Sequence, residues 1–250
     1  MIAIALAGIG VVAVVAVQPE GATAVPAAKP SPVVYPHPVI TEVLFAVPGG
    51  GAGDADGDGS RSATGDEFVE LYNPHDTAIE LEGFVLTDAE PVAKPGEARA
   101  NRDSDNRLRF EFPKLTLPPG GVVVVFNGFE SKLKGPVGDR KAAPKAGNPA
   151  FHDAFVFSMK TESKYAAFSN SGDCVVLTAP DGTPVQCLKW AETAEKLPAD
   201  RATVTDVAPE SKGSVQRESP AGEFVAHRTL PHPYGGELFS PGRFGPPPAP

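Results

Sequence analysis

The stretch Val122-Val-Val-Val-Phe126 decides the fold of this chain. It is a continuous run of β-forming apolar residues that follows the turn Leu117-Pro-Pro-Gly-Gly121. A strand that is covered on both faces has this composition, whereas a strand with one wet face alternates. The run therefore predicts a layered β domain.

Other short apolar segments surround this run and are separated by turn residues. Glu67-Phe-Val-Glu-Leu-Tyr-Asn73 ends at Pro74, and 77–88 places Ile79 and Leu81 inward with Glu80 outward. Ala179-Pro-Asp-Gly-Thr183 has the residues of a type I turn with a following left-handed residue, so it predicts a hairpin. The remaining predicted strands are 39–45, 108–112, 174–178, 184–190, 213–217 and 223–227.

Composition supports the same class. The chain holds 28 Pro and 26 Gly, which suits short strands joined by many turns and not a helical bundle. We predict an all-β fold, an immunoglobulin-like antiparallel β-sandwich, although strand spacing alone does not separate a sandwich from a barrel. Four polar excursions are predicted to lie on its surface: 52–66, 89–106, 128–153 and 191–212.

The ends of the chain carry other signals. The apolar run 1–17 is short for a membrane span, and Ala22-Thr-Ala24 resembles a cleavage site, so 1–24 is predicted to be a signal peptide. A retained N-terminal membrane anchor is the alternative. Residues 25–37 form a predicted Pro-rich linker, 38–244 the domain, and 245–250 a disordered Pro-rich tail. These signals predict a secreted or cell-surface protein.

The net charge of −9 and the pI near 5.1 disfavour non-specific binding to nucleic acid, which needs a positive surface. The predicted partner is a protein or a surface polymer, with membrane contact only through an uncleaved N-terminal segment.

Asp54-Ala-Asp-Gly-Asp-Gly-Ser60 is the sharpest local motif. Alternate carboxylates let one loop wrap oxygens around calcium, a glycine at the sixth place permits the bend, and the seventh residue supplies a carbonyl. The residues in these places are Asp54, Asp56, Asp58, Gly59 and Ser60. Gly65 stands where a bidentate acid is expected at the twelfth place, so Asp66 or Glu67 is predicted to close the site. We predict calcium binding at about 10⁻⁴ to 10⁻³ M; the alternative is a solvated, flexible loop.

The two cysteines, Cys174 and Cys187, lie on the two arms of the predicted hairpin. Directly opposite or one step apart, they could form a cross-strand disulfide, which an oxidising exterior would favour. Two buried free thiols are the alternative.

No catalytic arrangement is evident in the sequence. It has no Gly-x-Ser-x-Gly elbow and no His pair at metal-ligand spacing. Glu67 and Glu70 are three apart on one strand and so face opposite sides, whereas a glycosidase pair must converge on one cleft. Trp190 suits a packed core residue better than a sugar-stacking one. We therefore predict no enzymatic activity.

Several segments resemble the lamin-tail domain as it occurs in bacterial secreted proteins, in that family's order. They are Ile40–Leu44, Asp66–Pro74, Thr77–Asp88, Phe110–Pro113 with Leu117–Val125, and Gly213–Arg217 with Ser240–Gly242. The resemblance covers residues 38–243 and departs from the family at Phe84, where Trp is more usual. It implies an immunoglobulin-like interaction or attachment module with no catalytic residues.

The expected function is thus an extracellular or cell-surface interaction module with calcium in its acidic loop. Two alternatives stay open at this point. One is an accessory domain or a metal-dependent hydrolase acting on phosphoesters or glycans, and the other is a structural component of the cell envelope.

Overall fold

The computed structural model describes residues 36–88, 108–191, 202–231 and 236–244. In these residues the regular structure is β strand, apart from short 3-10 turns at Gly51–Gly53, Pro149–Phe151 and His227–Thr229. The strands are β1 (Val39–Leu44), β2 (Phe68–Tyr72), β3 (Ile79–Glu80), β4 (Val85–Thr87), β5 (Arg109–Glu111), β6 (Thr116–Leu117), β7 (Val122–Phe126), β8 (Val137–Gly138), β9 (Phe155–Ser158), β10 (Gly172–Thr178), β11 (Pro184–Ala191), β12 (Thr203–Val207), β13 (Val215–Arg217) and β14 (Phe224–Ala226).

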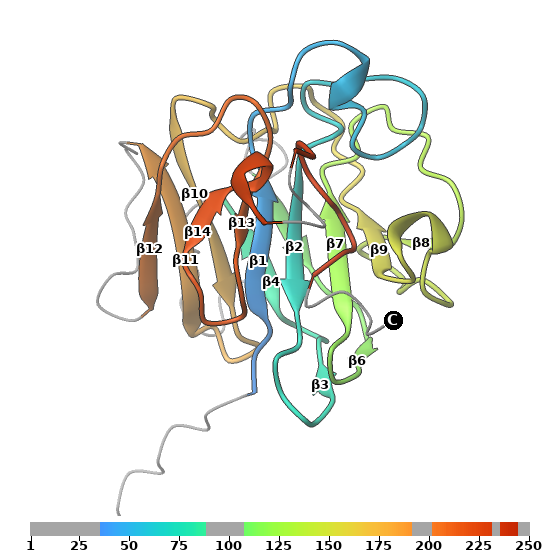
Figure 1. Cartoon of the computed structure of the whole chain (residues 1–250). Helices are drawn as coiled ribbons and strands as arrows, with labels where there is room; N and C mark the ends of the chain where they lie inside the picture. Colours follow the sequence, from blue (N-terminus) through green and yellow to red (C-terminus); the bar gives the residue numbers. More distant parts are fainter. Residues whose placement is uncertain (1–35, 89–107, 192–201, 232–235, 245–250) are drawn as a thin grey trace, which may run out of the picture. The chain divides into compact units, whose positions relative to one another are not determined.

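Two large sheets make up the sandwich. The seven-stranded sheet has the order β14-β13-β1-β2-β7-β9-β8, and the five-stranded sheet has the order β12-β11-β10-β4-β5. In Figure 1 the seven-stranded sheet lies in front, with β4 and β10 behind it. Strands β3 and β6 form a separate pair at one end. The predicted all-β sandwich is therefore confirmed.

Both faces of the seven-stranded sheet are buried. Val123 and Val125 of β7 pack between the sheets with Val175 and Leu188, whereas Val124 faces a second apolar cluster on the outer side. The other buried members of that second cluster are Leu44, Val47, Ala55, Phe68, Phe126, Phe151, Ala154 and Val156. Its residues come from the sheet and from the excursions 46–66 and 127–154. The continuous apolar run Val122–Phe126 is thus buried on both faces, as its composition predicts.

The arrangement differs from the expected antiparallel sandwich in three strand pairs. β7 pairs with β9, β8 with β9, and β11 with β12, all in parallel. Parallel neighbours need a crossover connection, and the long stretches 127–154 and 192–202 supply that length. No strand is predicted from the sequence over β8, β9 or β12, because such connections lack the short turn signal of a hairpin.

The predicted strand 77–88 is in fact two strands. Gly83 has φ of +81°, a left-handed conformation that turns the chain between β3 and β4. β3 then pairs with β6, while β4 joins the five-stranded sheet beside β10. Ile79, Leu81, Phe84 and Leu86 still reach one core.

The predicted hairpin is confirmed. The Gly182 amide donates to the Ala179 carbonyl at 2.9 Å, and Gly182 has φ of +87°. β10 and β11 flank this turn as antiparallel neighbours. At the far end of the hairpin Trp190 is fully buried, stacks on Phe45 with 4.1 Å between ring centroids, and donates its indole N–H to the Ser169 carbonyl. Trp190 is a core residue, as expected.

The predicted signal peptide and its cleavage site, nearly all of the linker, and the C-terminal tail lie outside the described residues. Among the residues that the structure does describe, there is no helix with the length and apolar character needed to cross a bilayer.

Replacing Trp190 by Ala should lower the free energy of unfolding by about 3–5 kcal/mol, because it removes a buried ring and leaves a cavity against Phe45. Chemical denaturation measures this change. Tyr165→Ala is the matched control: Tyr165 is 68% exposed, so its loss should change stability by less than about 0.5 kcal/mol. Equal effects of the two substitutions would contradict the assigned packing.

Candidate functional site

The acidic loop, residues 54–60, lies beside the outer face of the seven-stranded sheet. Carboxylate oxygens of Asp54, Asp56 and Asp58 lie within 4.8 Å of one another. Gly57 and Gly59 have φ of +65° and +98°, and this left-handed backbone folds the loop tightly enough for alternate side chains to meet. The three aspartates at alternate positions are thus brought together.

Hydrogen bonds hold the acidic loop in this shape. Asp54 accepts the Gly59 amide at 3.0 Å, Asp56 accepts the Asp58 amide at 3.0 Å, and Asp58 accepts the Ser60 amide at 2.8 Å. The loop is also tied to the next excursion. The Ser131 hydroxyl donates to Asp56, and the Lys132 amide donates to Asp58 at 2.8 Å. The carboxylates are therefore preorganised.

The electrostatics of the acidic loop are unfavourable without a counter-charge. Asp56 is only 4% exposed, and burial raises its pKa to about 6, helped by the charges of Asp66 and Asp58 and opposed by its hydrogen bonds. Within the described parts of the chain, Asp54 Oδ1 accepts no hydrogen bond although it is shielded from solvent. A cation among the three aspartates would offset both costs.

The other predicted ligands lie outside this group of three. Asp66 accepts the amides of Ala55 at 2.7 Å, Asp56 at 2.9 Å and Ser62 at 2.6 Å, so it shapes the loop through the backbone. Ser60 is exposed. Glu67 belongs to a different cluster: it accepts the Asn127 side-chain amide at 3.3 Å and the Phe168 amide at 3.1 Å. Burial raises the pKa of Glu67, and nearby acids add to that effect.

A groove of about 290 Å³ borders the acidic loop. Asp54 and Asp56 lie on it, together with His152 and Ser240. Lys134 and Arg243 bring positive charge to the same groove. The sequence offered no histidine near the loop, because His152 is almost a hundred residues away and reaches it only through the folded excursion 127–154.

Two buried glutamates on the outer face of the seven-stranded sheet were not predicted as a site. Glu42 of β1 and Glu70 of β2 face each other in the strand register, and both are fully buried. Glu42 accepts the Ser240 amide at 3.0 Å, and Glu70 accepts the Gly242 amide at 2.8 Å. Two side chains from the start of the domain therefore hold its last segment, residues 237–244.

Further polar groups surround this pair. Glu42 also accepts the Ser214 hydroxyl, and Glu70 accepts the Thr41 hydroxyl at 2.8 Å. His227 Nε2 lies 2.7 Å from the Ser240 hydroxyl and 3.9 Å from Glu42. Burial raises the pKa of Glu42 to about 7. Burial and the charge of Glu42 raise the pKa of Glu70, so ionisation of either carboxyl disfavours ionisation of the other.

The predicted disulfide is not formed, and this expectation is corrected: Cys174 and Cys187 are free, buried thiols. The register pairs Cys174 with Lys189 and Cys187 with Val176, so the cysteines are diagonal neighbours. Diagonal positions are about 7–8 Å apart, beyond the usual Cα separation of a disulfide. A hydrogen bond between the thiols and burial raise the pKa of Cys174.

The architecture and the sites together define a class of protein: an immunoglobulin-like β-sandwich with polar loops on one face. A comparison with protein families agrees, since residues 36–192 match the model of the Lamin Tail Domain. The match covers more than half of the chain, so this chain belongs to the lamin-tail-domain family, whose members are non-enzymatic immunoglobulin-like interaction modules. No curated protein matches it.

The buried glutamates predict a pH dependence of stability. Because the folded pKa of Glu42 lies near 7 and its unfolded pKa near 4.5, the folded state binds more protons between these values. The free energy of unfolding should therefore fall as pH rises from about 4.5 to 7, by roughly 3 kcal/mol from Glu42 alone. Chemical denaturation at a series of pH values measures this slope.

Glu42→Gln should remove that part of the slope, while Glu82→Gln at an exposed position should leave it intact. A slope that is unchanged in Glu42→Gln would refute the assignment to this carboxyl.

Proposed function

We propose that this chain is a non-enzymatic interaction module that acts outside the cell or at its surface, with calcium ordering its acidic loop. The observation that carries the calcium proposal is the meeting of Asp54, Asp56 and Asp58 in one preorganised loop. Carboxylates are the ligands that calcium prefers. The loop's own hydrogen bonds support a structural ion, because the backbone is already shaped for it.

Export is supported by the N-terminal sequence, with its apolar run 1–17 and the small-x-small site Ala22-Thr-Ala24. Interaction is supported by the family and by the placement of the described excursions 46–66 and 127–154 on a rigid sandwich, where binding residues commonly lie. The partner in this proposal is a protein or a polymer of the cell surface.

Calcium at 5 mM should stabilise the protein by about 1 kcal/mol and raise Tm by about 2–4 °C, if the affinity is in the submillimolar range. Thermal unfolding with calcium, with magnesium and with EDTA measures the shift. Asp56→Asn should abolish most of it. Asp181→Asn, at an exposed turn position, should keep it. An unshifted wild-type Tm in 5 mM calcium would end the calcium proposal.

Metal-dependent hydrolysis is the competing function, and one observation favours it. His152 lines the same groove as Asp54 and Asp56, so a general base could stand beside a metal ion there. We expect no turnover of a phosphoester and glycan panel, with or without calcium or manganese. If the wild type hydrolyses a substrate faster than the blank and His152→Ala does not, the protein is an enzyme and the proposal of a non-enzymatic module is wrong.

A further inference from the structure

The excursion between β7 and β9 carries exposed lysines in an otherwise acidic protein. Four of them define what we call the basic face: Lys132, Lys134, Lys141 and Lys145. In the described regions none of the four is in an ion pair, whereas Lys160 nearby is paired with Asp139 at 2.6 Å. Their positive charge is therefore not neutralised by a paired acid, although Lys134 also lines the groove beside Asp54 and Asp56 and the whole chain has a net charge of −9.

The backbone beneath the basic face is held by one buried side chain. Asn148 is 1% exposed, and its side-chain amide donates to the carbonyls of Lys134 at 2.8 Å and Pro136 at 3.3 Å. Gly135 has φ of +82°, and a Cβ there would lie 2.8 Å from the Asn148 oxygen, so this segment packs directly on Asn148. The backbone that carries Lys134 is thus fixed by Asn148.

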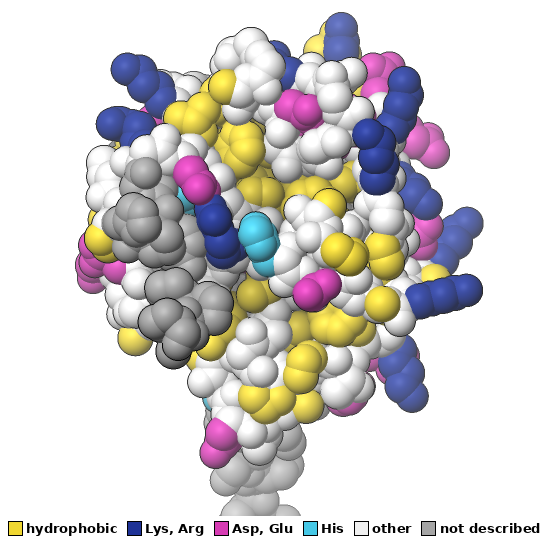
Figure 2. Space-filling model, turned by 45° about the vertical axis from the view of Figure 1, so that its right-hand side comes forward, with side chains coloured by type: hydrophobic (Ala, Val, Ile, Leu, Met, Phe, Trp, Pro, Cys, Tyr) yellow, Lys and Arg dark blue, Asp and Glu magenta, His cyan; other side chains and the backbone are white. Residues whose placement is uncertain are grey.

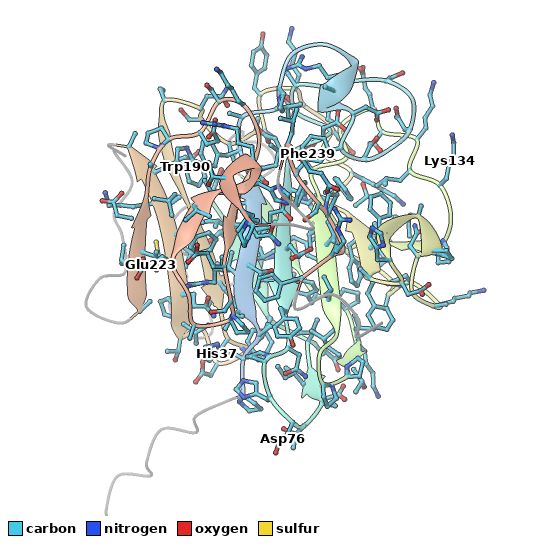
Figure 3. All side chains as sticks on the ribbon, in the orientation of Figure 1. His37, Asp76, Lys134, Trp190, Glu223 and Phe239 are labelled. Atoms are coloured by element: carbon cyan, nitrogen blue, oxygen red, sulfur yellow. The ribbon has the colours of Figure 1, made fainter. Side chains whose placement is uncertain are left out.

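The basic face lies at the edge of the seven-stranded sheet, where β8 is the outermost strand beside β9. Lys134 points away from the sheet there (Figure 3). Figure 2 turns this side forward and shows Lys and Arg side chains projecting along its right-hand rim, with acidic side chains between them. The charges are displayed outward from a fixed backbone.

We infer that the basic face binds an anionic polysaccharide, through Lys132, Lys134, Lys141 and Lys145. This inference rests on the proposed surface-binding function and names the chemistry of its partner. Lysine ammoniums are compact point charges that can each meet one carboxylate or sulfate along a polymer. All four lysines lie within residues 132–145 of one excursion, so a polymer that carries many negative charges can meet several of them together.

Nucleic acid fits this face less well. Single-stranded nucleic acid is bound on exposed aromatic rings, and in residues 128–154 Phe151 is buried and Phe129 half-buried, so no Phe, Tyr or Trp ring is free for stacking.

Binding of the full chain to dextran sulfate, with uncharged dextran as the blank, tests the inference. The titration is run in EDTA at several salt concentrations, so that it does not depend on the acidic loop. If four lysines each displace a counterion, affinity should fall on the order of 10²-fold between 50 and 200 mM salt.

Lys134→Gln/Lys141→Gln should roughly halve the slope of log affinity against log salt, because two contacts are lost. Lys114→Gln/Lys212→Gln removes the same charge from exposed lysines outside the basic face and should leave the slope unchanged. The substituted side chains are all exposed, so thermal unfolding should be unaltered in both variants.

Three outcomes would overturn the inference. If wild type shows no retention at 50 mM salt, the lysines serve only to keep the edge strand β8 from pairing with other chains. Equal losses in the two double variants would mean diffuse charge attraction. Tighter binding of a DNA oligonucleotide of matched charge would assign the face to nucleic acid. The Tm shift with calcium is measured separately, so it can succeed or fail independently of this result.

Discussion

The requirement to keep both faces of the seven-stranded sheet from water governs the structure. One face packs on the five-stranded sheet, which is the ordinary solution for a sandwich. The other face carries Leu44, Phe68, Val124, Phe126 and Val156, and a sheet with these residues cannot be left exposed. Loops therefore cover it. The acidic loop and the basic face belong to excursions whose buried residues form that cover, so their positions follow from packing.

The same constraint explains the buried glutamates. A covering segment that is not a strand leaves backbone amides without ladder partners, and each unpaired amide is costly to bury. Glu42 and Glu70 accept amides from residues 240 and 242 and so satisfy this segment. Desolvation of the carboxyls opposes the arrangement, which is why their pKa values rise. The polar pair fixes where the last segment lies, which apolar contacts alone would not do.

Much of the fold could be read from the sequence because its signals are local. The apolar run Val122–Phe126 requires two covers, and Ala179–Thr183 carries the chemistry of its own turn. The parallel strands β9 and β12 could not be predicted. Each is reached through a long crossover, so no local turn signal indicates which strand it pairs with. The diagonal placement of Cys174 and Cys187 depends on register at the hairpin, where a shift occurs next to Thr178.

The candidate site divides in the same way. Asp54, Asp56 and Asp58 were predicted together because they stand at alternate positions of one short loop. Asp66 and Glu67 were placed in that site by proximity along the chain, yet their partners are chosen by the fold: backbone amides for Asp66, and Asn127 for Glu67. Glu42 had one detectable signal, a charged residue inside the apolar strand Val39–Phe45. Its partner residues are 172 and 198 positions away.

That separation has a consequence for how the molecule is made. Glu42 and Ser240 meet across almost the full length of the domain, so the last segment cannot cover the outer face of the seven-stranded sheet until residue 240 has been synthesised. Partly assembled chains expose the uncovered sheet during that interval, and such long-range closure is intrinsically slow. Closure of the outer face therefore comes late, after residues 237–244 have been made.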